Sequence, residues 1–318
     1  MSGKNVTEVV LADAHGIAKA AKILESGGLV AVPTETVYGL AARADSADAV
    51  AKIYAAKGRP DFNPLIVHVS DLEQAKRIGR VEGVCEKIAE EEWPGPLTLV
   101  VPLTDNAKIA AAVTAGLPTV ALRSPHHPAM HALLKQVDFP LAAPSANRSG
   151  FISPTSAEHV MGSLAGRIDL VLDGGATKAG LESTILVVRE DGSWQVLRPG
   201  PISQEDIADR YFAGLVASEQ AGELLVEAPG QLTSHYSPGK PIRLNTTEAA
   251  PDDFVIGFGA IGGDCSLSEC GDLSQAAARL YDCLHQAARS EKSQIAVAPI
   301  PGEGIGRAIN DRLRRAAA

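Results

Sequence analysis

Lys57-Gly58-Arg59-Pro60-Asp61-Phe62-Asn63-Pro64 leads directly into the apolar run Leu65-Ile66-Val67-His68-Val69. Such a run is typical of a buried strand, so the polar residues before it lie at a strand end. A second polar cluster, Ala143-Pro144-Ser145-Ala146-Asn147, continues from another apolar run. Cations, small hydroxyls and an amide at strand ends are suited to holding phosphates and a small polar metabolite. The two clusters therefore predict an α/β protein with a specific ligand site.

Apolar runs of strand length alternate with segments of helical spacing through the first two thirds of the chain. Ile17, Ala20, Ala21 and Leu24 recur at helical spacing and end at Gly27-Gly28. Further helices are expected at 47–56 and over 71–92, and strands at 29–33, 97–101, 119–122, 141–143, 170–172, 184–188 and 194–197. This interleaving predicts an α/β domain with a mixed, twisted sheet over about 1–205.

The composition is ordinary for a soluble globular protein. The 318 residues are 45% hydrophobic and 21% charged, which allows a sizeable core and two domains. A net charge of −9 argues against broad nucleic-acid wrapping, although 52–80 is locally basic. The four cysteines lack zinc-ligand spacing, so no metal knuckle or disulfide framework is predicted. No apolar segment is long enough to span a membrane, and the cytoplasm is the expected location.

A helical segment is expected near 203–217, and a second, smaller α/β unit is expected after a linker. The segment 228–241 is rich in Pro, Gly and Ser, which break regular structure. Beyond it, strands at 254–257 and 295–300 alternate with helices at 273–288 and 305–315. The glycines of 257–262 fit a dinucleotide-binding pattern, but no convincing helix follows them as that pattern requires. The sequence also contains no P-loop and no nucleophile-elbow pattern, which argues against conventional P-loop NTPases and serine hydrolases.

Several polar residues at strand ends allow two interpretations. The segment 33–40, with its Thr, Glu and Tyr side chains, is either a ligand-binding loop or a capped turn that feeds the next helix. Lys57 and Arg59 either bind a triphosphate or form a solvated helix end. Arg123 follows a buried strand and needs an anion partner, which is either a structural carboxylate or one on the substrate.

Taken together, motifs in a fixed order resemble the YrdC-type threonylcarbamoyl-AMP synthase family. They are Pro33-Thr34-Glu35-Thr36-Val37-Tyr38-Gly39-Leu40, Lys57-Gly58-Arg59-Pro60 with Asn63-Pro64-Leu65, Trp93-Pro94-Gly95-Pro96-Leu97-Thr98, Ser145-Ala146-Asn147 and Glu182-Ser183-Thr184-Ile185. The segments 197–200, 235–238 and 304–313 resemble the family's long form. The resemblance implies a YrdC-like twisted mixed sheet with flanking helices and a smaller, Rossmann-like C-terminal α/β domain. The implied division is 1–212 catalytic, 213–242 linker or lid, and 243–318 C-terminal.

The resemblance also implies the reaction: condensation of L-threonine, bicarbonate and ATP to threonylcarbamoyl-AMP and pyrophosphate, which serves a tRNA modification. Lys57 and Arg59 match the family's catalytic K-x-R pair. The residues implied around L-threonine are Thr36, His68, Arg123, Ser145 and Ser183. Those implied around ATP are Arg59, Asn63, Thr119, Asn147, Ser153, Arg198 and Tyr236. Mg²⁺ is implied as the companion of ATP, without a protein metal site. A downstream tRNA threonylcarbamoyltransferase complex, or tRNA itself, is implied as a transient partner.

Two other functions fit parts of the sequence. An RNA-binding protein without chemistry of its own would use the basic stretch 52–80, but only 4% of the residues are aromatic, which provides no clear stacking platform. A carbamoyl-transfer domain of a maturation enzyme would need an accompanying zinc-finger or acylphosphatase-like segment. The cysteine pattern provides no such zinc finger.

Overall fold

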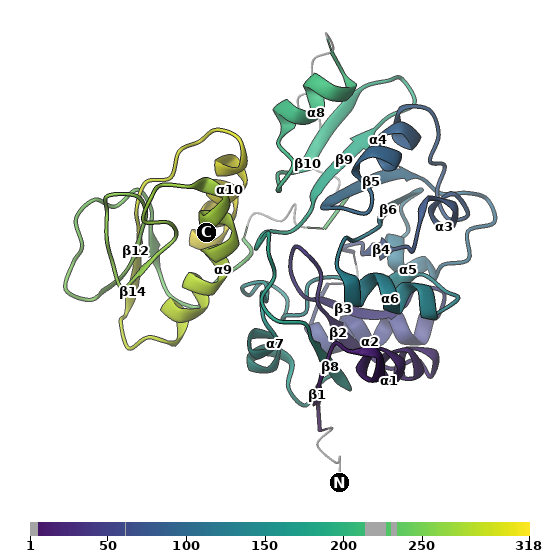
Figure 1. Ribbon diagram of the computed structural model, residues 1–318, viewed down its shortest axis with the longest axis horizontal. Coiled ribbons are helices and arrows are strands. Elements are labelled where there is room, and N and C mark those ends of the chain that lie inside the picture. The colour runs from purple at the N-terminus through teal and green to yellow at the C-terminus, as the bar shows by residue number, and fades with distance from the viewer. Residues whose placement is uncertain (1–5, 61, 214–226, 230–233) are drawn as a thin grey trace.

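The computed structural model describes residues 6–60, 62–213, 227–229 and 234–318. Among these, one large mixed sheet and one small parallel sheet organise the chain (Figure 1). The larger sheet has ten strands, which in spatial order are β1 (Glu8–Leu11), β8 (Leu170–Asp173), β2 (Val30–Val32), β3 (Gly39–Arg43), β7 (Leu141–Ala142), β4 (Ile66–His68), β6 (Thr119–Arg123), β5 (Leu97–Pro102), β9 (Thr184–Val188) and β10 (Trp194–Arg198). The α/β fold with a mixed sheet, predicted from the sequence, is confirmed.

Helices cover both faces of the large sheet. They are α1 (Ala14–Glu25), α2 (Ala47–Lys57), α3 (Leu72–Lys76), α4 (Val84–Glu92), α5 (Ala111–Thr114), α6 (Pro128–Gln136), α7 (Ala157–Leu164) and α8 (Gln204–Tyr211). One apolar cluster joins α2, α4 and α7 to one face, and a separate cluster joins α1 and α6 to the other. Side-chain caps set the helix starts: Asp13 accepts from the Gly16 amide, and Ser46 accepts from the Ala49 amide. Gly58 ends α2 in the left-handed region at φ 62°.

The small sheet contains four parallel strands and is covered by two amphipathic helices. Its strands, in spatial order, are β11 (Ile242–Arg243), β14 (Gln294–Val297), β12 (Asp253–Gly257) and β13 (Cys265–Ser266). Its helices are α9 (Leu273–Arg289) and α10 (Ile305–Ala317). The element that follows Gly257 is β13 and not a helix, so the helix required by the dinucleotide-binding pattern is missing, as predicted.

The two sheets belong to units that contact each other closely. Val37, Ile152 and Leu181 of the larger unit share an apolar cluster with α9 and α10. At Gly180, with φ at 70°, an added Cβ would lie 2.4 Å from the carbonyl oxygen of Ala277. No larger residue fits here, because the backbone of α9 passes directly over this turn. The C-terminal unit therefore packs directly beside residues 180–183 (Figure 1).

The strands and helices expected from the sequence are found, with boundaries shifted by a few residues. One interpretation of 33–40 is wrong: this segment does not feed a helix, because Gly39 begins β3, which pairs antiparallel with β2. The last expected strand ends at Val297 and does not reach Ile300. The expected helix at 203–217 ends as α8 at Tyr211, and residues 214–217 lie outside the described part. Among the described helices, none has the length and apolar character needed to cross a membrane.

Candidate active site

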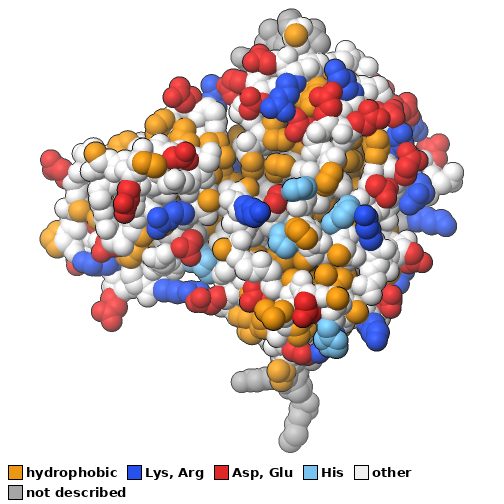
Figure 2. Space-filling view, viewed as in Figure 1, with side chains coloured by type: hydrophobic (Ala, Val, Ile, Leu, Met, Phe, Trp, Pro, Cys, Tyr) orange, Lys and Arg blue, Asp and Glu red, His pale blue; other side chains and the backbone are white. Residues whose placement is uncertain are grey.

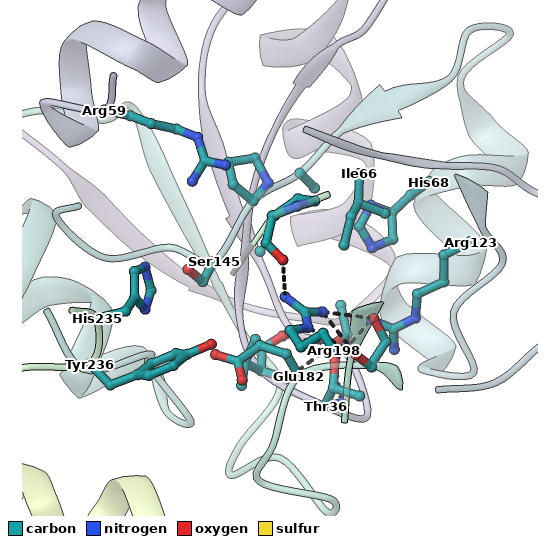
Figure 3. Close-up of a pocket in the computed structure, with 17 residues that line it drawn as sticks. Thr36, Arg59, Ile66, His68, Arg123, Ser145, Glu182, Arg198, His235 and Tyr236 are labelled. Atoms are coloured by element: carbon teal, nitrogen blue, oxygen red, sulfur yellow. Dashed lines mark hydrogen bonds between the residues drawn. The ribbon is translucent and has the colours of Figure 1, made fainter. Parts of the chain in front are cut away.

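A polar pocket lies where the ends of β2, β4 and β6 meet residues 182–183 and the linker (Figure 3). Its free space is about 50 Å³. It is lined by Thr34, Thr36, Val37, Gly39, Arg59, Ile66, His68, Arg123, Ala143, Pro144, Ser145, Glu182, Ser183, Arg198, Pro229, His235 and Tyr236. Eight of the residues implied by the resemblance are among them: Thr36, Arg59, His68, Arg123, Ser145, Ser183, Arg198 and Tyr236. The sequence motifs thus meet at one place although they are far apart in the chain.

Arg123 ends β6 and is held by three of its donors. Its Nε donates to the carbonyl oxygen of Gly95 at 3.1 Å, Nη1 to Thr36 Oγ1 at 3.0 Å, and Nη2 to Glu35 Oε1 at 2.6 Å. The anion partner left open by the sequence is therefore, in this structure, the structural carboxylate of Glu35. Burial works to raise the pKa of Glu35, but the charge and hydrogen bond of Arg123 outweigh it, and the pKa lies below its ordinary value.

His68 lies beside Arg123, because β4 and β6 pair in register at these two residues. Burial, and secondly the charge of Arg123, lower the pKa of His68 to about 3. The imidazole is therefore neutral at physiological pH. Its Nδ1 is buried and has no hydrogen-bond partner among the described residues. A neutral ring with an unpaired nitrogen beside a fixed guanidinium can hydrogen-bond a ligand without adding charge.

Two pairs of hydroxyls lie at the pocket, and three of the four residues, Thr34, Thr36 and Ser183, line it. Thr34 Oγ1 lies 2.8 Å from Thr36 Oγ1, and Thr98 Oγ1 lies 2.7 Å from Ser183 Oγ. Arg198 approaches the second pair from β10: its Nη2 donates to Ser183 Oγ at 3.1 Å and to the Ser183 carbonyl oxygen at 2.9 Å. The hydroxyls of Thr36 and Ser183 are thereby fixed in orientation before any ligand is present.

Lys57 and Arg59 have different surroundings although they are two residues apart. Lys57 is buried at the end of α2, and its Nζ donates to the carbonyl oxygens of Ser145 and Asn147, both at 2.5 Å. Burial, with the nearby charge of Arg59, places the pKa of Lys57 well below its ordinary value. Its interpretation as part of a solvated helix end is wrong. Lys57 does not line the pocket. It holds the Ser145–Asn147 loop by two hydrogen bonds, and Ser145 of that loop lines the pocket.

Arg59 does reach the pocket, from the loop after α2 (Figure 3). Its Nε and Nη2 donate to the carbonyl oxygens of Asn63 and Pro64, at 3.2 and 2.8 Å. Burial lowers the pKa of Arg59 to about 10, so the guanidinium keeps its charge at neutral pH. The Tyr54 hydroxyl also interacts with this guanidinium.

Five of the implied residues do not line the pocket: Lys57, Asn63, Thr119, Asn147 and Ser153. Asn63 and Asn147 are buried, and the side-chain oxygen of each has no partner among the described residues. Thr119 is half-buried at the start of β6, opposite Pro102. Ser153 is buried and donates to Glu182 Oε1 at 2.5 Å, so it contacts the pocket through that carboxylate.

Sequence reasoning assigned no role to four residues of this site: Thr34, Thr98, Glu182 and His235. Thr34, Glu182 and His235 line the pocket, and Thr98 supports Ser183 from behind. All four belong to motifs quoted from the sequence, so proximity to an assigned neighbour is the signal that could have found them. Burial works to raise the pKa of Glu182. The charges of Arg312 and Arg198 outweigh it, so the pKa is lowered to about 2.

Part of the basic stretch 52–80, the feature that favoured an RNA-binding protein, is buried or paired with carboxylates. Lys57 is buried, and Lys76 pairs with Glu86 at 2.7 Å. On the face shown in Figure 2, the Lys and Arg side chains of the described residues alternate with Asp and Glu. Counterion release needs clustered exposed cations, so this arrangement does not favour RNA binding as the chain's own function.

The fold and the site define a two-unit α/β protein with an arginine-lined pocket for a small polar substrate and an anion. Comparison with known proteins is specific. Residues 22–200 match the Sua5/YciO/YrdC family model, described as "Telomere recombination", and residues 202–318 match the model "Threonylcarbamoyl-AMP synthase, C-terminal domain". The Bacillus subtilis threonylcarbamoyl-AMP synthase is 39% identical, with 98% of this chain and 96% of the relative covered.

Relatives from a second organism agree. The Pyrococcus abyssi threonylcarbamoyl-AMP synthase is 36% identical, covering 93% of this chain and 92% of the relative. The crystal structure of Pyrococcus abyssi Sua5 complexed with L-threonine superposes with a TM-score of 0.86 at 33% identity, covering 98% of this chain and 97% of that one. The chain belongs to the Sua5-type threonylcarbamoyl-AMP synthase family, whose members carry a YrdC domain and a Sua5 C-terminal domain. The predicted family, fold class and nucleotidyltransferase activity are confirmed.

Proposed function

We propose that this pocket joins L-threonine, bicarbonate and MgATP into threonylcarbamoyl-AMP. The observation that carries the proposal is the presence of Arg59, Arg123 and Arg198 on the walls of one polar pocket. The reaction brings a carbamate and a triphosphate together, and both are anions. Fixed cations in a water-poor site stabilise that encounter and the charge that develops on the α-phosphate.

The covalent steps need no nucleophile from the protein. The neutral threonine amine attacks the carbon of bicarbonate, and hydroxide leaves that carbon together with one amine proton as water, which gives threonylcarbamate. A carbamate oxygen then bonds to the α-phosphorus, while the bond from that phosphorus to the α–β bridging oxygen breaks. Pyrophosphate leaves with the electron pair. The residues of this chain contribute by positioning the reactants and by stabilising charge.

Arg123 is suited to binding the threonine carboxylate. A guanidinium has five N–H donors. Three serve Gly95, Thr36 and Glu35, which leaves one hydrogen on each terminal nitrogen for the substrate. Two parallel donors match a carboxylate in bidentate geometry. Thr36, Ser183, Ser145 and neutral His68 then surround the amine and the side chain of threonine.

Arg59 and Arg198 are proposed to contact the nucleotide, and Asn63 and Asn147 to accept its hydrogen bonds. Buried amide oxygens without a donor need one, and ribose hydroxyls or an adenine amino group provide it. The described residues include no group of three or more His, Cys, Asp or Glu that could hold a metal ion. Glu182, which lines the pocket, and Glu35, which is bonded to Arg123, are both paired with arginine. Mg²⁺ therefore enters as part of the substrate MgATP, held by phosphate oxygens and water.

The described part of the linker is proposed to act as a lid. Pro229, His235 and Tyr236 line the pocket, whose free space of about 50 Å³ holds only a few waters. Because these residues line the pocket, we expect them to move aside when MgATP and threonine enter. On return they would shield the labile adenylate from hydrolysis. We further propose that the product passes, in the cytoplasm, to a tRNA threonylcarbamoyltransferase complex or to tRNA.

Pyrophosphate release tests the proposed function. Purified protein with MgATP, bicarbonate and L-threonine should release pyrophosphate and form an adduct with the mass of threonylcarbamoyl-AMP. Omission of threonine or bicarbonate should abolish both signals. Pyrophosphate release that does not depend on threonine would contradict the proposal.

A further inference from the structure

An arginine from the C-terminal helix is buried at the wall of the active-site pocket. Arg312 of α10 has a relative exposure of 0%, and its Nε donates to Glu182 Oε2 at 2.9 Å. Its Nη2 donates to the carbonyl oxygen of Pro199 at 2.9 Å, next to Arg198. Asp311 accepts from Nη1 at 2.7 Å. Every nitrogen of this guanidinium therefore has a partner, and two of the three partners belong to the larger unit.

Glu182 depends on these contacts. It lines the pocket, and its carboxylate accepts from Ser153 at 2.5 Å, from Tyr281 of α9 at 2.8 Å and from Arg312. A buried carboxylate that lacks a paired cation is strongly disfavoured. Without Arg312, its negative charge would also face the phosphates of the nucleotide that the pocket is proposed to bind. The pairing therefore offsets a negative charge that an approaching triphosphate would otherwise meet.

Arg312 also contacts the linker. Its guanidinium lies 5.3 Å from the ring centroid of Tyr236, and that ring stacks at 5.6 Å on Tyr281. The backbone amide of His235 donates to the carbonyl oxygen of Arg315, one turn further along α10. In Figure 3 the Tyr236 hydroxyl points toward Glu182. The closed position of Tyr236 is thus defined on one side by residues of α9 and α10.

We propose that Arg312 is a positioning residue of the synthase: it neutralises Glu182 and seats Tyr236, so that the C-terminal unit completes the nucleotide subsite. This inference rests on the proposed function of the pocket. It assigns the C-terminal unit a task in ATP binding, which differs from simply holding the two units together. Exposed ion pairs, such as Arg289 with Glu158 at 2.5 Å between α9 and α7, also join the units but lie at the surface.

The test is a double-mutant cycle with Arg312→Met and Glu182→Gln in the full chain. Arg312→Met should weaken binding of a non-hydrolysable ATP analogue, measured by calorimetry, by about tenfold or more, because it leaves the carboxylate unpaired. It should raise the KM for ATP in parallel and change the KM for threonine by less than about threefold. Adding Glu182→Gln should restore most of the lost analogue affinity, since the amide carries no charge.

Controls separate this role from a structural one. Arg289→Met removes an exposed ion pair between the units and should leave analogue affinity within about twofold of wild type. Arg312→Lys keeps a cation and should lie between wild type and Arg312→Met. The proposal is overturned if Arg312→Met binds the analogue normally, or if Glu182→Gln gives no rescue in a double variant whose thermal midpoint matches the single variant. Because binding is measured without turnover, absence of threonylcarbamoyl-AMP in the wild-type assay would overturn the proposed function separately.

Discussion

Arg123 has a structural partner in this protein and is proposed to bind the substrate as well. The sequence indicated that a charged residue at the end of a buried strand needs an anion, and it named both a structural and a substrate carboxylate. In the structure, the structural carboxylate is that of Glu35. Two hydrogens of the Arg123 guanidinium remain, and these are proposed to bind the substrate carboxylate. The position of Glu35 relative to Arg123 could not be predicted, because these residues are 88 positions apart and no local pattern relates them.

Arg123→Lys should raise the KM for threonine by about 10-fold to 100-fold, because lysine lacks the planar fork that holds Thr36, Glu35 and a carboxylate together. The KM for ATP should change little. Steady-state pyrophosphate release at varied threonine measures the effect. Arg80→Lys, at an exposed ion pair with Asp105, is the matched control and should behave as wild type. Equal effects on both KM values would contradict a threonine-specific role.

Lys57 was predicted to be catalytic, and the structure places it behind the pocket rather than in it. Its ammonium is the donor for two loop carbonyls. Charged hydrogen bonds of this kind contribute about 1.5–3 kcal/mol each when buried. A direct contact between Lys57 and the nucleotide remains a prediction.

Lys57→Met should lower the free energy of unfolding by about 1.5–3 kcal/mol or more and should also reduce kcat, because the Ser145–Asn147 loop loses two hydrogen bonds. Denaturant unfolding and pyrophosphate release measure the two effects. Lys52→Met, on the same helix but exposed, should change stability by less than about 1 kcal/mol. A Lys57 variant with wild-type stability and no activity would instead favour a purely catalytic role.

At the scale of elements, strand pairing explains why the motifs converge. The parallel register of β5 with β9 pairs Thr98 with Ile185, two residues after Ser183, and the Thr98 hydroxyl lies 2.7 Å from that of Ser183. The register of β4 with β6 places His68 beside Arg123. Buried strands such as β4 and β6 could be predicted because their apolar runs are continuous. β3 could not, since Gly39 and Leu40 complete a motif that resembles a turn. β1 was not predicted either, because it is a short and largely exposed edge strand. Pairing order is set by tertiary packing and is not encoded in any single run.

Thr98→Val should raise the KM for threonine by about threefold to tenfold, because the Ser183 hydroxyl loses its hydrogen bond to Thr98. Such a bond contributes about 0.5–1.5 kcal/mol. Thr98→Ser, which keeps the hydroxyl, should remain close to wild type. Kinetics at varied threonine check both. If valine and serine have the same effect, packing on β5 and not the hydrogen bond is responsible.

At the scale of the whole molecule, one buried and two half-buried neutral histidines link stability to pH. Burial is the main reason that the pKa values of His68, His235 and His285 are each lowered to about 3. Below pH 6.5 the unfolded chain binds protons at these positions and the folded chain does not. Stability contributed by the neutral rings is therefore complete above pH 6.5 and is lost as the pH falls toward 3.

The thermal midpoint should accordingly fall between pH 6.5 and 5, with a loss of stability on the order of a few kcal/mol. Glu182 adds to this at lower pH. Its pKa is lowered to about 2, so its contribution is present above its ordinary value of 4.5 and is lost as the pH falls from there toward 2. Calorimetric scans across this range measure both. A midpoint that is constant from pH 7 to 5 would show that these rings are solvated.

The arrangement of the two units was the part of the molecule least accessible to sequence reasoning. The linker and the C-terminal α/β unit were predicted, and their boundaries at 212 and 242 remain predictions. Contact between Glu182 and Arg312 joins residues 130 positions apart, and each belongs to a motif that by itself predicts only a helix or a strand end. Only the packing of α9 and α10 beside residues 180–183 brings them together.

The most direct measurement is a crystal structure of this chain with L-threonine and a non-hydrolysable MgATP analogue bound together. The account predicts the threonine carboxylate on Arg123 and the phosphates beside Arg59 and Arg198, under Tyr236. Ligands bound at any other surface, or a nucleotide seated in this pocket without contact to either arginine, would contradict it.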